Sequence, residues 1–311
     1  MSLNFKVIYL NLLVQIYTGT NQPEDRSCLD DSYRWNLLVQ LLEKQIQDDT
    51  NVLCFQEVSR EWRNRLVSFF RKHNYDFTYE NYGHKYNDYM GVFMAWKKQI
   101  FSAIEEPIVP GDHIKSESDI KEPTLTAWEW IKTKMCCLSK PKRFTDYESM
   151  NKSLKDAKRR RNVLQCVHLS DKFGKKITVM NYHMPCAFYD LEQMRLHIDF
   201  IVNKTKEYAK INPVILGGDF NTKPVDLTYD GFSSLTNAYV AVNGTQPKAT
   251  TNAVTMRGDK LSTFVGTLDH CFFIGEGLTP TSAEVTDASR PMPNMDWPSD
   301  HSMIKFGFKL E

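Results

Sequence analysis

Short apolar runs alternate along the chain with segments whose apolar residues recur every three or four positions. The runs have the length and the β-branched or aromatic content of strands, and they lie at residues 5–13, 52–55, 91–96, 163–169, 177–183, 213–216, 271–274 and 303–308. Helical periodicity lies at residues 31–46, 62–70 and 191–208, and we expect Asp31-Ser32 to cap the first helix. Alternating strands and helices predict a layered α/β fold with helices outside the sheet. The partial alternation of the last run is typical of a strand at a sheet edge.

Many of these predicted strands end in polar residues. In the stretch 213–221, four apolar residues lead into two glycines and then into Asp219, Phe220 and Asn221. In an extended segment Phe220 can point inward while Asp219 and Asn221 share the opposite face. One such residue alone is more often a turn former than a catalytic group. The other polar strand ends are Asn11, Glu57, His183, Asp269, Asp300 and His301. Packing explains so many poorly, since each would bury an avoidable polar group, and this favours one shared site.

The residue types at these strand ends favour hydrolysis of phosphate esters. Acids and amides without cysteine favour a hard cation, Mg²⁺ or Mn²⁺. The seven cysteines form no CxxC pair, which argues against zinc and against a disulfide framework. Two histidines with an ordinary pKa of about 6.5 can transfer protons near neutral pH. A metal that polarises a phosphoryl oxygen and a positioned water that attacks in line would together cleave a phosphodiester.

Composition narrows the class of protein but does not name a ligand. The 311 residues are 41% hydrophobic and carry a formal charge of +1, so the chain is globular and has no global field that attracts nucleic acid. From about residue 107 to 162 the regular pattern dissolves into an insertion-like region. Between Lys140 and Arg161, nine basic residues oppose three acidic ones. Such a run is either a solvated surface or an edge that tracks phosphates.

The apolar segments predict neither export nor membrane insertion. The first strand carries Asn4, Lys6 and Asn11, and it lacks the basic start and the cleavage site of a signal peptide. No run approaches the roughly 18 apolar residues of a membrane span. An odd number of cysteines fits a reducing compartment. We therefore expect an intracellular protein, cytoplasmic or nuclear, with no membrane partner.

In their order along the chain, these residues resemble the signature of the endonuclease/exonuclease/phosphatase superfamily. The motifs are YLNLL around Asn11, CFQEV around Glu57, NYHMP around His183, GGDFNTKP around Asp219 and Asn221, TLDHCFF around Asp269, and PSDH ending in Asp300-His301. Together with Tyr33-Arg34, the segments LNLLVQIY, GDFNTKP and WPSDH are most similar to the deadenylase and nocturnin branch. The resemblance implies one catalytic domain over residues 1–311. Its fold would be a four-layered α/β sandwich of the DNase I-like type, two packed mixed sheets flanked by helices, with the site at one end.

The resemblance also implies roles for individual residues. Glu57 would bind the Mg²⁺, with help from Asn11 and Asp300. Asp219 and Asn221 would orient or deprotonate the attacking water. The resemblance leaves open which group is the general base.

The two histidines would work on the phosphate itself. Asp269 would fix the ring and tautomer of His301, which would contact the scissile phosphate or act as base. His183 would stabilise the pentavalent phosphate or protonate the leaving oxygen. Asn162 resembles an asparagine of the same branch at the start of its strand, and Arg161 could contact phosphate.

One position departs from the family's pattern. Where the family often has an acid just before Gly91, an acid that supports the first histidine, this chain has Met90. Asp88 lies two residues earlier and would share the face of Met90, so either Asp88 takes the acid's place or His183 is left less basic. Four tyrosines near this point are either surface packing in a loop or platforms for a substrate base: Tyr79, Tyr82, Tyr86 and Tyr89.

The sequence favours a Mg²⁺-dependent phosphodiesterase that acts on single-stranded RNA, a 3′-exonuclease similar to deadenylases, and a monomer. A second hypothesis keeps the chemistry and changes the substrate to DNA, an inositol phosphate or another small phosphate ester. A third is a catalytically inactive binding module, which predicts the loss of an acid or histidine that this chain retains. A basic groove with aromatic residues would favour the first hypothesis, and a tight closed pocket the second.

Overall fold

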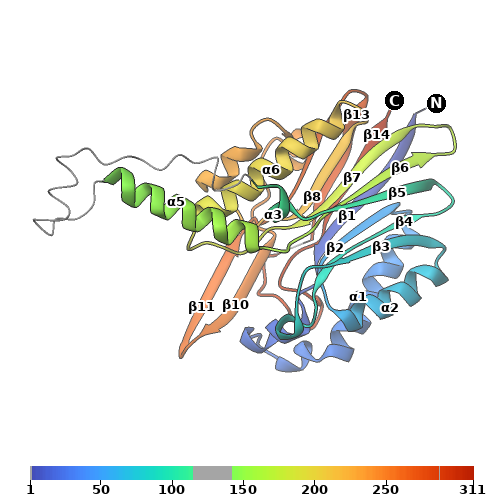
Figure 1. The fold of residues 1–311 in the computed structure, drawn as a ribbon. Coiled ribbons are helices and arrows are strands. Elements are labelled where there is room, and N and C mark those ends of the chain that lie inside the picture. The colour runs from blue at the N-terminus through green and yellow to red at the C-terminus, as the bar shows by residue number, and fades with distance from the viewer. Residues whose placement is uncertain (1, 115–141, 287) are drawn as a thin grey trace, which may run out of the picture.

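Two β-sheets packed face to face form the centre of the molecule (Figure 1). The computed structural model describes residues 2–114, 142–286 and 288–311. The first sheet contains β1 Leu3–Asn11, β2 Val52–Val58, β3 Tyr75–Asn81, β4 Gly91–Lys97, β13 Leu278–Val285 and β14 Ile304–Leu310. In the described part of the chain, its six strands follow the order β13-β14-β1-β2-β4-β3. Only β1 and β2 are parallel among these neighbours.

The second sheet is built in the same way from the other half of the chain. It contains β5 Phe101–Ile108, β6 Leu164–Asp171, β7 Lys176–His183, β8 Val214–Asp219, β9 Thr236–Asn237 and β12 Asp269–Ile274. Over the described residues, the six strands follow the order β5-β6-β7-β8-β12-β9, with β7 and β8 parallel. A separate hairpin, β10 Thr251–Arg257 and β11 Lys260–Gly266, projects from the sandwich at the end opposite the two termini (Figure 1).

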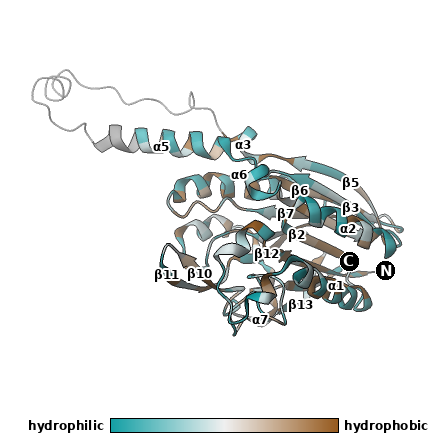
Figure 2. Ribbon diagram, turned by 90° about the horizontal axis from the view of Figure 1, so that it is seen from below, coloured by the Kyte–Doolittle hydropathy of each residue, from teal (hydrophilic) through white to brown (hydrophobic). Residues whose placement is uncertain are grey.

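Helices cover both outer faces of the sandwich. The α-helices are α1 Asp31–Gln47, α2 Arg60–Lys72, α3 Pro110–His113, α5 Lys142–Arg159, α6 Leu191–Ala209 and α7 Ala238–Asn243. The 3-10 helices are η1 Gln15–Thr20, η2 Arg26–Leu29, η3 Lys85–Asn87 and η5 Leu227–Phe232. Helices α1 and α2 pack their apolar faces on the first sheet, and α6 packs on the second. In Figure 2 the strand β2 is brown, whereas the outer helices show teal surfaces, as burial of one helical face requires.

The inter-sheet core fixes how the two sheets meet. Val7, Tyr9, Cys54, Val179 and Ile215 are buried in it, and each large apolar side chain contributes roughly 1.5–3 kcal/mol. The Tyr9 ring lies against the backbone of Gly217, where any Cβ would collide with it. One reason for the first glycine of the GGD motif is therefore close packing of β8 on β1.

The topology brings the predicted strand ends together. Parallel β1 and β2 end at the same edge, and so do parallel β7 and β8. Antiparallel pairing of β12 with β8 places Asp269 opposite Asp219, while the register of β7 places His183 beside Asp219. Segments that are far apart in sequence thus deliver polar side chains to one end of the sandwich.

The structure confirms the predicted four-layered sandwich and changes several details. Strand β14 pairs with both β13 and β1, so the expectation of an edge strand is wrong. The first helix is capped by Asp30, whose side chain accepts a hydrogen bond from the Tyr33 amide, not by Asp31 or Ser32. Tyr79 lies in strand β3, not in a loop.

Part of the predicted insertion can be described. Its described residues form the end of β5, then α3, α5 and the chain that leads into β6, whereas residues 115–141 lie outside the described part. That the region is an insertion stays a prediction. Among the residues described, no helix combines the length and the apolar character that crossing a bilayer requires.

Candidate functional site

Glu57 owes its position to a local irregularity of β2. The pairing of β2 with β4 shifts register between Phe55 and Val58, and Glu57 has a φ of 53°, in the left-handed region. Such backbone costs of order 1–3 kcal/mol in a non-glycine residue and clusters at functional sites. The bulge turns the Glu57 carboxylate toward the end of the sandwich, where its side chain is 13% exposed.

Asn11 connects this carboxylate to the second sheet. Its Nδ2 donates to Glu57 Oε1 at 3.1 Å and to Asp219 Oδ2 at 3.0 Å. The carboxylates of residues 57 and 219 therefore share one amide group, as the sequence-based hypothesis of a single site requires. The Asn11 Oδ1 accepts from the Leu13 amide at 2.9 Å. Asn11 thus presents N–H donors and not an oxygen ligand toward Glu57 in this arrangement, and its role at a metal stays a prediction.

Asp219 and Asn221 form a tight turn at the end of β8. The Asn221 amide donates to Asp219 Oδ1 at 2.9 Å, and Asn221 Nδ2 donates to the Met184 carbonyl at 2.9 Å. Phe220 is fully buried, as predicted. Asn221 is not part of an extended strand, because its φ is 48°. The turn, not strand alternation, brings Asn221 into the site beside Asp219.

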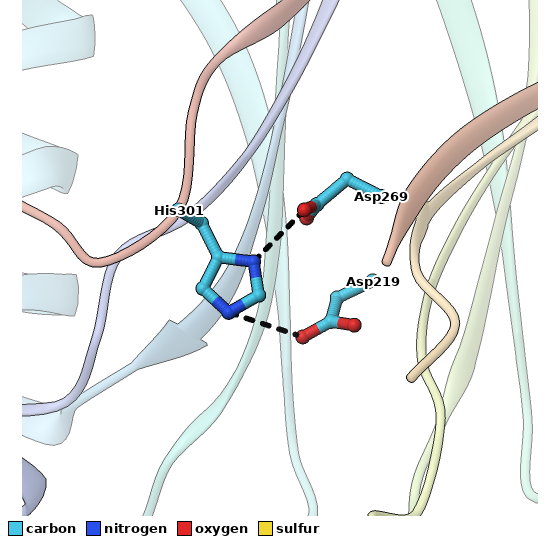
Figure 3. Close-up of side chains that lie close together, drawn as sticks. All are labelled: Asp219, Asp269 and His301. Atoms are coloured by element: carbon cyan, nitrogen blue, oxygen red, sulfur yellow. Dashed lines mark hydrogen bonds and ion pairs between the residues drawn. The ribbon is translucent and has the colours of Figure 1, made fainter. Parts of the chain in front are cut away.

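His301 and Asp269 form a hydrogen-bonded pair next to Asp219 (Figure 3). The His301 Nδ1 lies 2.9 Å from Asp269 Oδ2, and its Nε2 lies 3.7 Å from Asp219 Oδ2. Thr250 holds the same Asp269 oxygen by donating from Oγ1 at 2.6 Å. Burial alone would lower the pKa of His301, but the carboxylates of Asp269 and Asp219 raise it well above 6.5.

His183 is held by a tyrosine and not by an acid. The Tyr82 hydroxyl lies 2.6 Å from His183 Nδ1. The His183 Nε2 faces Glu57 Oε1 at 3.8 Å and Asp219 Oδ2 at 3.6 Å. Of the two alternatives that the sequence leaves open, the first does not hold, because Tyr82 and not Asp88 is the partner of His183.

The pairing of β3 with β4 explains this difference. The Tyr82 amide donates to the Met90 carbonyl at 3.2 Å, so Tyr82 lies across from the position where the family often has an acid. Asp88 instead sits in a left-handed turn, with a φ of 51°, and its carbonyl accepts from the Arg60 amide. The partner of the histidine thus comes from the residue that follows β3.

Asp300 lies beside Glu57 above a buried arginine. Burial raises the pKa of Asp300 to about 6; His301 and Arg34 oppose this effect, and the charge of Glu57 adds to it. The Arg34 side chain is fully buried, and its guanidinium donates to the carbonyls of Leu12, Leu13 and Pro298. Arg34 therefore holds together the loop that follows β1 and the loop that carries Asp300.

The donor set fits a hard divalent cation. Glu57, Asp300, Asp219 and Asp269 place four carboxylates in one small region, and such a concentration of negative charge favours a bound cation. Within the described residues, one trio of possible ligand atoms, on Asp219, Asp269 and His301, lies within 4.8 Å (Figure 3). His301 Nδ1 is already engaged by Asp269, so this trio is better explained as a histidine–carboxylate pair beside an acid. Glu57 and Asp300 remain the better candidates for a metal.

A cleft of about 740 Å³ opens over these residues. Glu57, His183, Asp219, Asn221 and His301 line its floor. Its lining also contains Tyr17, Tyr82, His84, Tyr86 and Asn87, which we call the aromatic wall, and Arg159, Arg160, Arg161, Asn162 and Cys186, which we call the basic wall. The cleft thus combines acidic, aromatic and basic residues.

Among the residues predicted to contact substrate, Asn162, Arg161 and Tyr86 line this cleft. Asn162 Nδ2 donates to the His183 carbonyl at 2.8 Å, and Arg161 pairs with Asp112 at 2.6 Å while its side chain stays 56% exposed. Tyr86 lines the cleft and is 70% exposed. Tyr79 and Tyr89 do not line it, since the Tyr79 hydroxyl donates to the Tyr89 carbonyl within the adjacent turn.

Sequence reasoning missed several residues that shape the site. Thr250 and Tyr17 follow no recognisable strand-end pattern; Tyr17 lies at the end of the LNLLVQIY segment, but nothing in the sequence marks it as a site residue. The sequence marks Arg34 only through the family resemblance, although an arginine on the apolar face of a predicted helix signals a buried cation. It predicts Tyr82 to be either surface packing or a stacking platform, and not the partner of His183.

Comparison with known proteins places this geometry in a family. The model of the Endonuclease/Exonuclease/phosphatase family matches residues 11–301, from Asn11 to His301. Members of this family are hydrolases, phosphodiesterases and phosphatases, and generally use a divalent metal. A search of curated protein sequences finds no match.

Solved structures share the fold over nearly their whole length. A structure of ANGEL2, a 2′,3′-cyclic phosphatase, in complex with adenosine-2′,3′-vanadate has a TM-score of 0.72 and 16% identity, covering 100% of this chain and 96% of that one. The human Nocturnin catalytic domain with bound sulfate anion has a TM-score of 0.66 and 17% identity, and the match covers 100% of this chain and 97% of that one. TDP2 of D. rerio complexed with a single-strand DNA product has a TM-score of 0.64 and 13% identity, and the match covers 98% of both chains. At these identities the likeness shows the fold, and the family match over residues 11–301 shows that the chain belongs to the endonuclease/exonuclease/phosphatase family.

Proposed function

We propose that this protein is a Mg²⁺-dependent phosphodiesterase that degrades single-stranded RNA from its 3′ end, in the manner of a deadenylase. The observation that carries the proposal is the composition of the cleft. A basic wall and an aromatic wall stand over a floor of carboxylates and histidines. Cations that track phosphates and rings that stack on bases are the usual means of holding single strands.

Glu57 and Asp300 would hold the metal, and Asn11 would keep Glu57 in place. When bound, Mg²⁺ would polarise a phosphoryl oxygen and offset the charge that develops on it. The strained backbone of Glu57 fits this role, because the bulge aims a carboxylate that regular pairing would leave elsewhere. The preference for Mg²⁺ over softer metals rests on oxygen donors without cysteine in the metal-binding group.

Asp219 and Asn221 would position the attacking water. Asp219 Oδ2 accepts from Asn11 and faces His183 and His301, so this carboxylate lies at the centre of the site. Asn221 is fixed through its Nδ2 by the Met184 carbonyl. A carboxylate that orients a water can also accept its proton as the water attacks in line.

The two histidines would act on the phosphate. Asp269 accepts the Nδ1 proton of His301, which leaves His301 Nε2 directed at the reaction region beside Asp219. A charged His301 would stabilise the negative phosphate through this nitrogen. His183 approaches from β7 and directs Nε2 toward the same region.

The substrate would lie along the two walls. Arg159 and Arg161 are 79% and 56% exposed, so their guanidinium groups are accessible to a phosphate backbone. Tyr17 and Tyr86 are exposed to 40% and 70%, and each could stack on a base. DNA, inositol phosphates and other small phosphate esters are the competing substrates, and the open basic groove favours a polymer over a small ester.

The buried cysteines bear on the compartment in which the protein works. Cys28, Cys54, Cys166 and Cys271 are buried free thiols, which supports a reducing compartment, either cytoplasm or nucleus. We place the protein there as a monomer that works on single-stranded RNA.

The test is a direct comparison of substrates. Labelled poly(A), mixed-sequence RNA, single-stranded DNA and inositol phosphates are each incubated with the protein and Mg²⁺, and then with EDTA. We expect RNA labelled at its 5′ end to shorten progressively from its 3′ end, and we expect EDTA to stop the reaction. RNA that stays intact while inositol phosphates are dephosphorylated would overturn the proposed substrate, and turnover in EDTA would overturn the proposed metal.

A further inference from the structure

The two histidines of the site differ in the group that holds Nδ1. Asp269 holds His301, and a carboxylate can only accept, so His301 must carry a proton on Nδ1. Tyr82 holds His183 at 2.6 Å, and a phenol can either donate or accept. The tautomer of His183 therefore depends on what faces its other nitrogen.

Two carboxylates face His183 Nε2. Glu57 Oε1 lies at 3.8 Å and Asp219 Oδ2 at 3.6 Å. A bare nitrogen lone pair facing two negative oxygens is unfavourable, whereas an N–H group pointing at them is attracted. The surroundings of Nε2 thus select the form that carries the proton on Nε2. In neutral histidine, Nδ1 must then accept.

From these contacts we infer that Tyr82 is a positioning residue: its hydroxyl donates to His183 Nδ1 and holds the neutral ring as an Nε2–H donor that points into the reaction region. The inference rests on the proposed phosphodiesterase function for its use, but not for its geometry. Burial, together with the charges of Glu57 and Asp219, raises the pKa of Tyr82 well above 10, so the hydroxyl keeps the proton that it donates.

This arrangement assigns His183 one of the two roles left open for it. A neutral imidazole that gave up its Nε2 proton would become an anion, which is unfavourable beside Glu57 and Asp219. Neutral His183 can instead donate a hydrogen bond to a non-bridging oxygen as negative charge builds up on the phosphate. In this neutral form it would act as a fixed donor, and no proton would be transferred from it.

The geometry of β3 and β4 makes Tyr82 suited to this task. Its amide is bonded to the Met90 carbonyl and its ring packs against His183 with centroids 5.9 Å apart. The ring orientation is therefore fixed from both the backbone and the side chain. Tyr79, three residues earlier, bonds a backbone carbonyl outside the cleft and offers a matched control.

The tautomer can be measured without any substrate. Nitrogen-15 NMR of protein labelled at its histidines distinguishes protonated from bare ring nitrogens, and loss of one signal pair in His183→Gln assigns the residue. At a pH where His183 is neutral, we expect a protonated Nε2 and a bare Nδ1 that accepts a hydrogen bond. Tyr82→Phe should shift Nδ1, and Tyr79→Phe should not. A proton on Nδ1 in the unaltered neutral protein would overturn the inference.

Kinetics then separate a fixed donor from a proton donor. We expect Tyr82→Phe to lower kcat about tenfold, with KM changed less than about twofold. The loss should be the same for a phosphodiester with a nucleoside leaving group and for one with p-nitrophenolate, because a donor to a non-bridging oxygen acts on both. A loss confined to the nucleoside ester would show proton transfer to the leaving oxygen and contradict the assigned role. Absence of all hydrolysis by the unaltered protein would sink the proposed function, while the NMR result would still decide the tautomer.

Discussion

The two sheets contribute different chemistry to one site. The first sheet and its loops supply the carboxylates of Glu57 and Asp300, which are the candidate metal ligands, and Asn11, whose amide holds Glu57. The second sheet supplies His183, Asp219 and Asp269, which hold or receive protons. His301 crosses between them, since it precedes β14 of the first sheet but pairs with Asp269 of the second.

This difference shows why the site needs the whole sandwich. The candidate metal ligands Glu57 and Asp300 belong to the first sheet and its loops, whereas His183, Asp219 and Asp269 belong to the second. The two meet through a few direct contacts, above all the Asn11 amide between Glu57 and Asp219. Beneath them, Gln56 Nε2 donates to Asn181 Oδ1 at 2.6 Å, and Asn181 Nδ2 donates to backbone carbonyls of Phe55 and Phe93. These buried polar contacts fix the registration of the sheets as well as the site.

The strongest way to break the first sheet's contribution is to remove Glu57. We expect Glu57→Ala to lose at least about 100-fold in rate, because the candidate metal loses its main carboxylate. Circular dichroism and thermal unfolding should show a folded protein. The matched control is Glu105→Gln, a carboxylate exposed on β5 that should retain full rate. Near-normal turnover of Glu57→Ala would remove this residue from the active site.

The contribution of the second sheet can be removed by changing His301 or its partner Asp269. We expect His301→Ala to lose at least about 100-fold in rate, and Asp269→Asn to lose rate as well, since the amide cannot hold the same charged ring. Both variants should still bind the metal, which distinguishes them from Glu57→Ala. Loss of metal binding together with rate in His301→Ala would show that the two contributions cannot be separated in this way.

Low pH should destabilise the part of the molecule that contains the second sheet, because two buried neutral histidines lie there. Burial lowers the pKa of His270 in β12 and of His197 in α6 to about 4, against 6.5 when unfolded. Protons bind the unfolded chain first, so this stability is complete above pH 6.5 and is lost as the pH falls toward 4, at about 1.4 kcal/mol per pKa unit. Urea unfolding at pH 7 and pH 4.5 should show the loss, and His270→Asn should show less of it. An unchanged pH dependence in His270→Asn would contradict the assigned cause.

The smallest effect is expected at the basic wall. Arg161→Gln should raise KM for RNA by about threefold and leave kcat unchanged, because an exposed ion pair contributes only about 0.2–1 kcal/mol. The weakening should decrease as salt increases, since the contact is to phosphate. Lys72→Gln, an exposed cation at the end of α2, is the control for net charge. A fall in kcat with no change in KM would place Arg161 at the reaction instead of the substrate path.

The sequence predicted the fold class and the meeting of several polar side chains at one end of the sandwich, for a physical reason. Apolar runs that end in acids, amides and histidines report both the strand and its end, so Glu57, His183, Asp219 and Asp269 could be assigned to one rim. The contacts among them could not be predicted, since they depend on register and turns. Glu57 and Asn221 take left-handed backbone conformations that no residue pattern announced.

The partner of His183 shows the limit most clearly. Spacing along the chain pointed to Asp88, because it lies two residues before Met90 and would share its face in a strand. The strand begins only at Gly91, and Asp88 lies in a turn. Tyr82 reaches His183 from the other arm of the β3–β4 hairpin, a relation that depends on β3, for which the sequence predicts no strand. In the same way, β14 was misplaced at an edge because β13 carries too little apolar pattern to be recognised.

The central claim is that the carboxylates of the first sheet and its loops hold a divalent cation beside the proton-handling groups of the second sheet. Titration calorimetry of Mg²⁺ into the unaltered protein, Glu57→Gln and Asp269→Asn tests it most directly. We predict that the unaltered protein and Asp269→Asn bind Mg²⁺ with similar affinity and that Glu57→Gln binds at least about tenfold more weakly. Equal affinity of Glu57→Gln and the unaltered protein would contradict the claim.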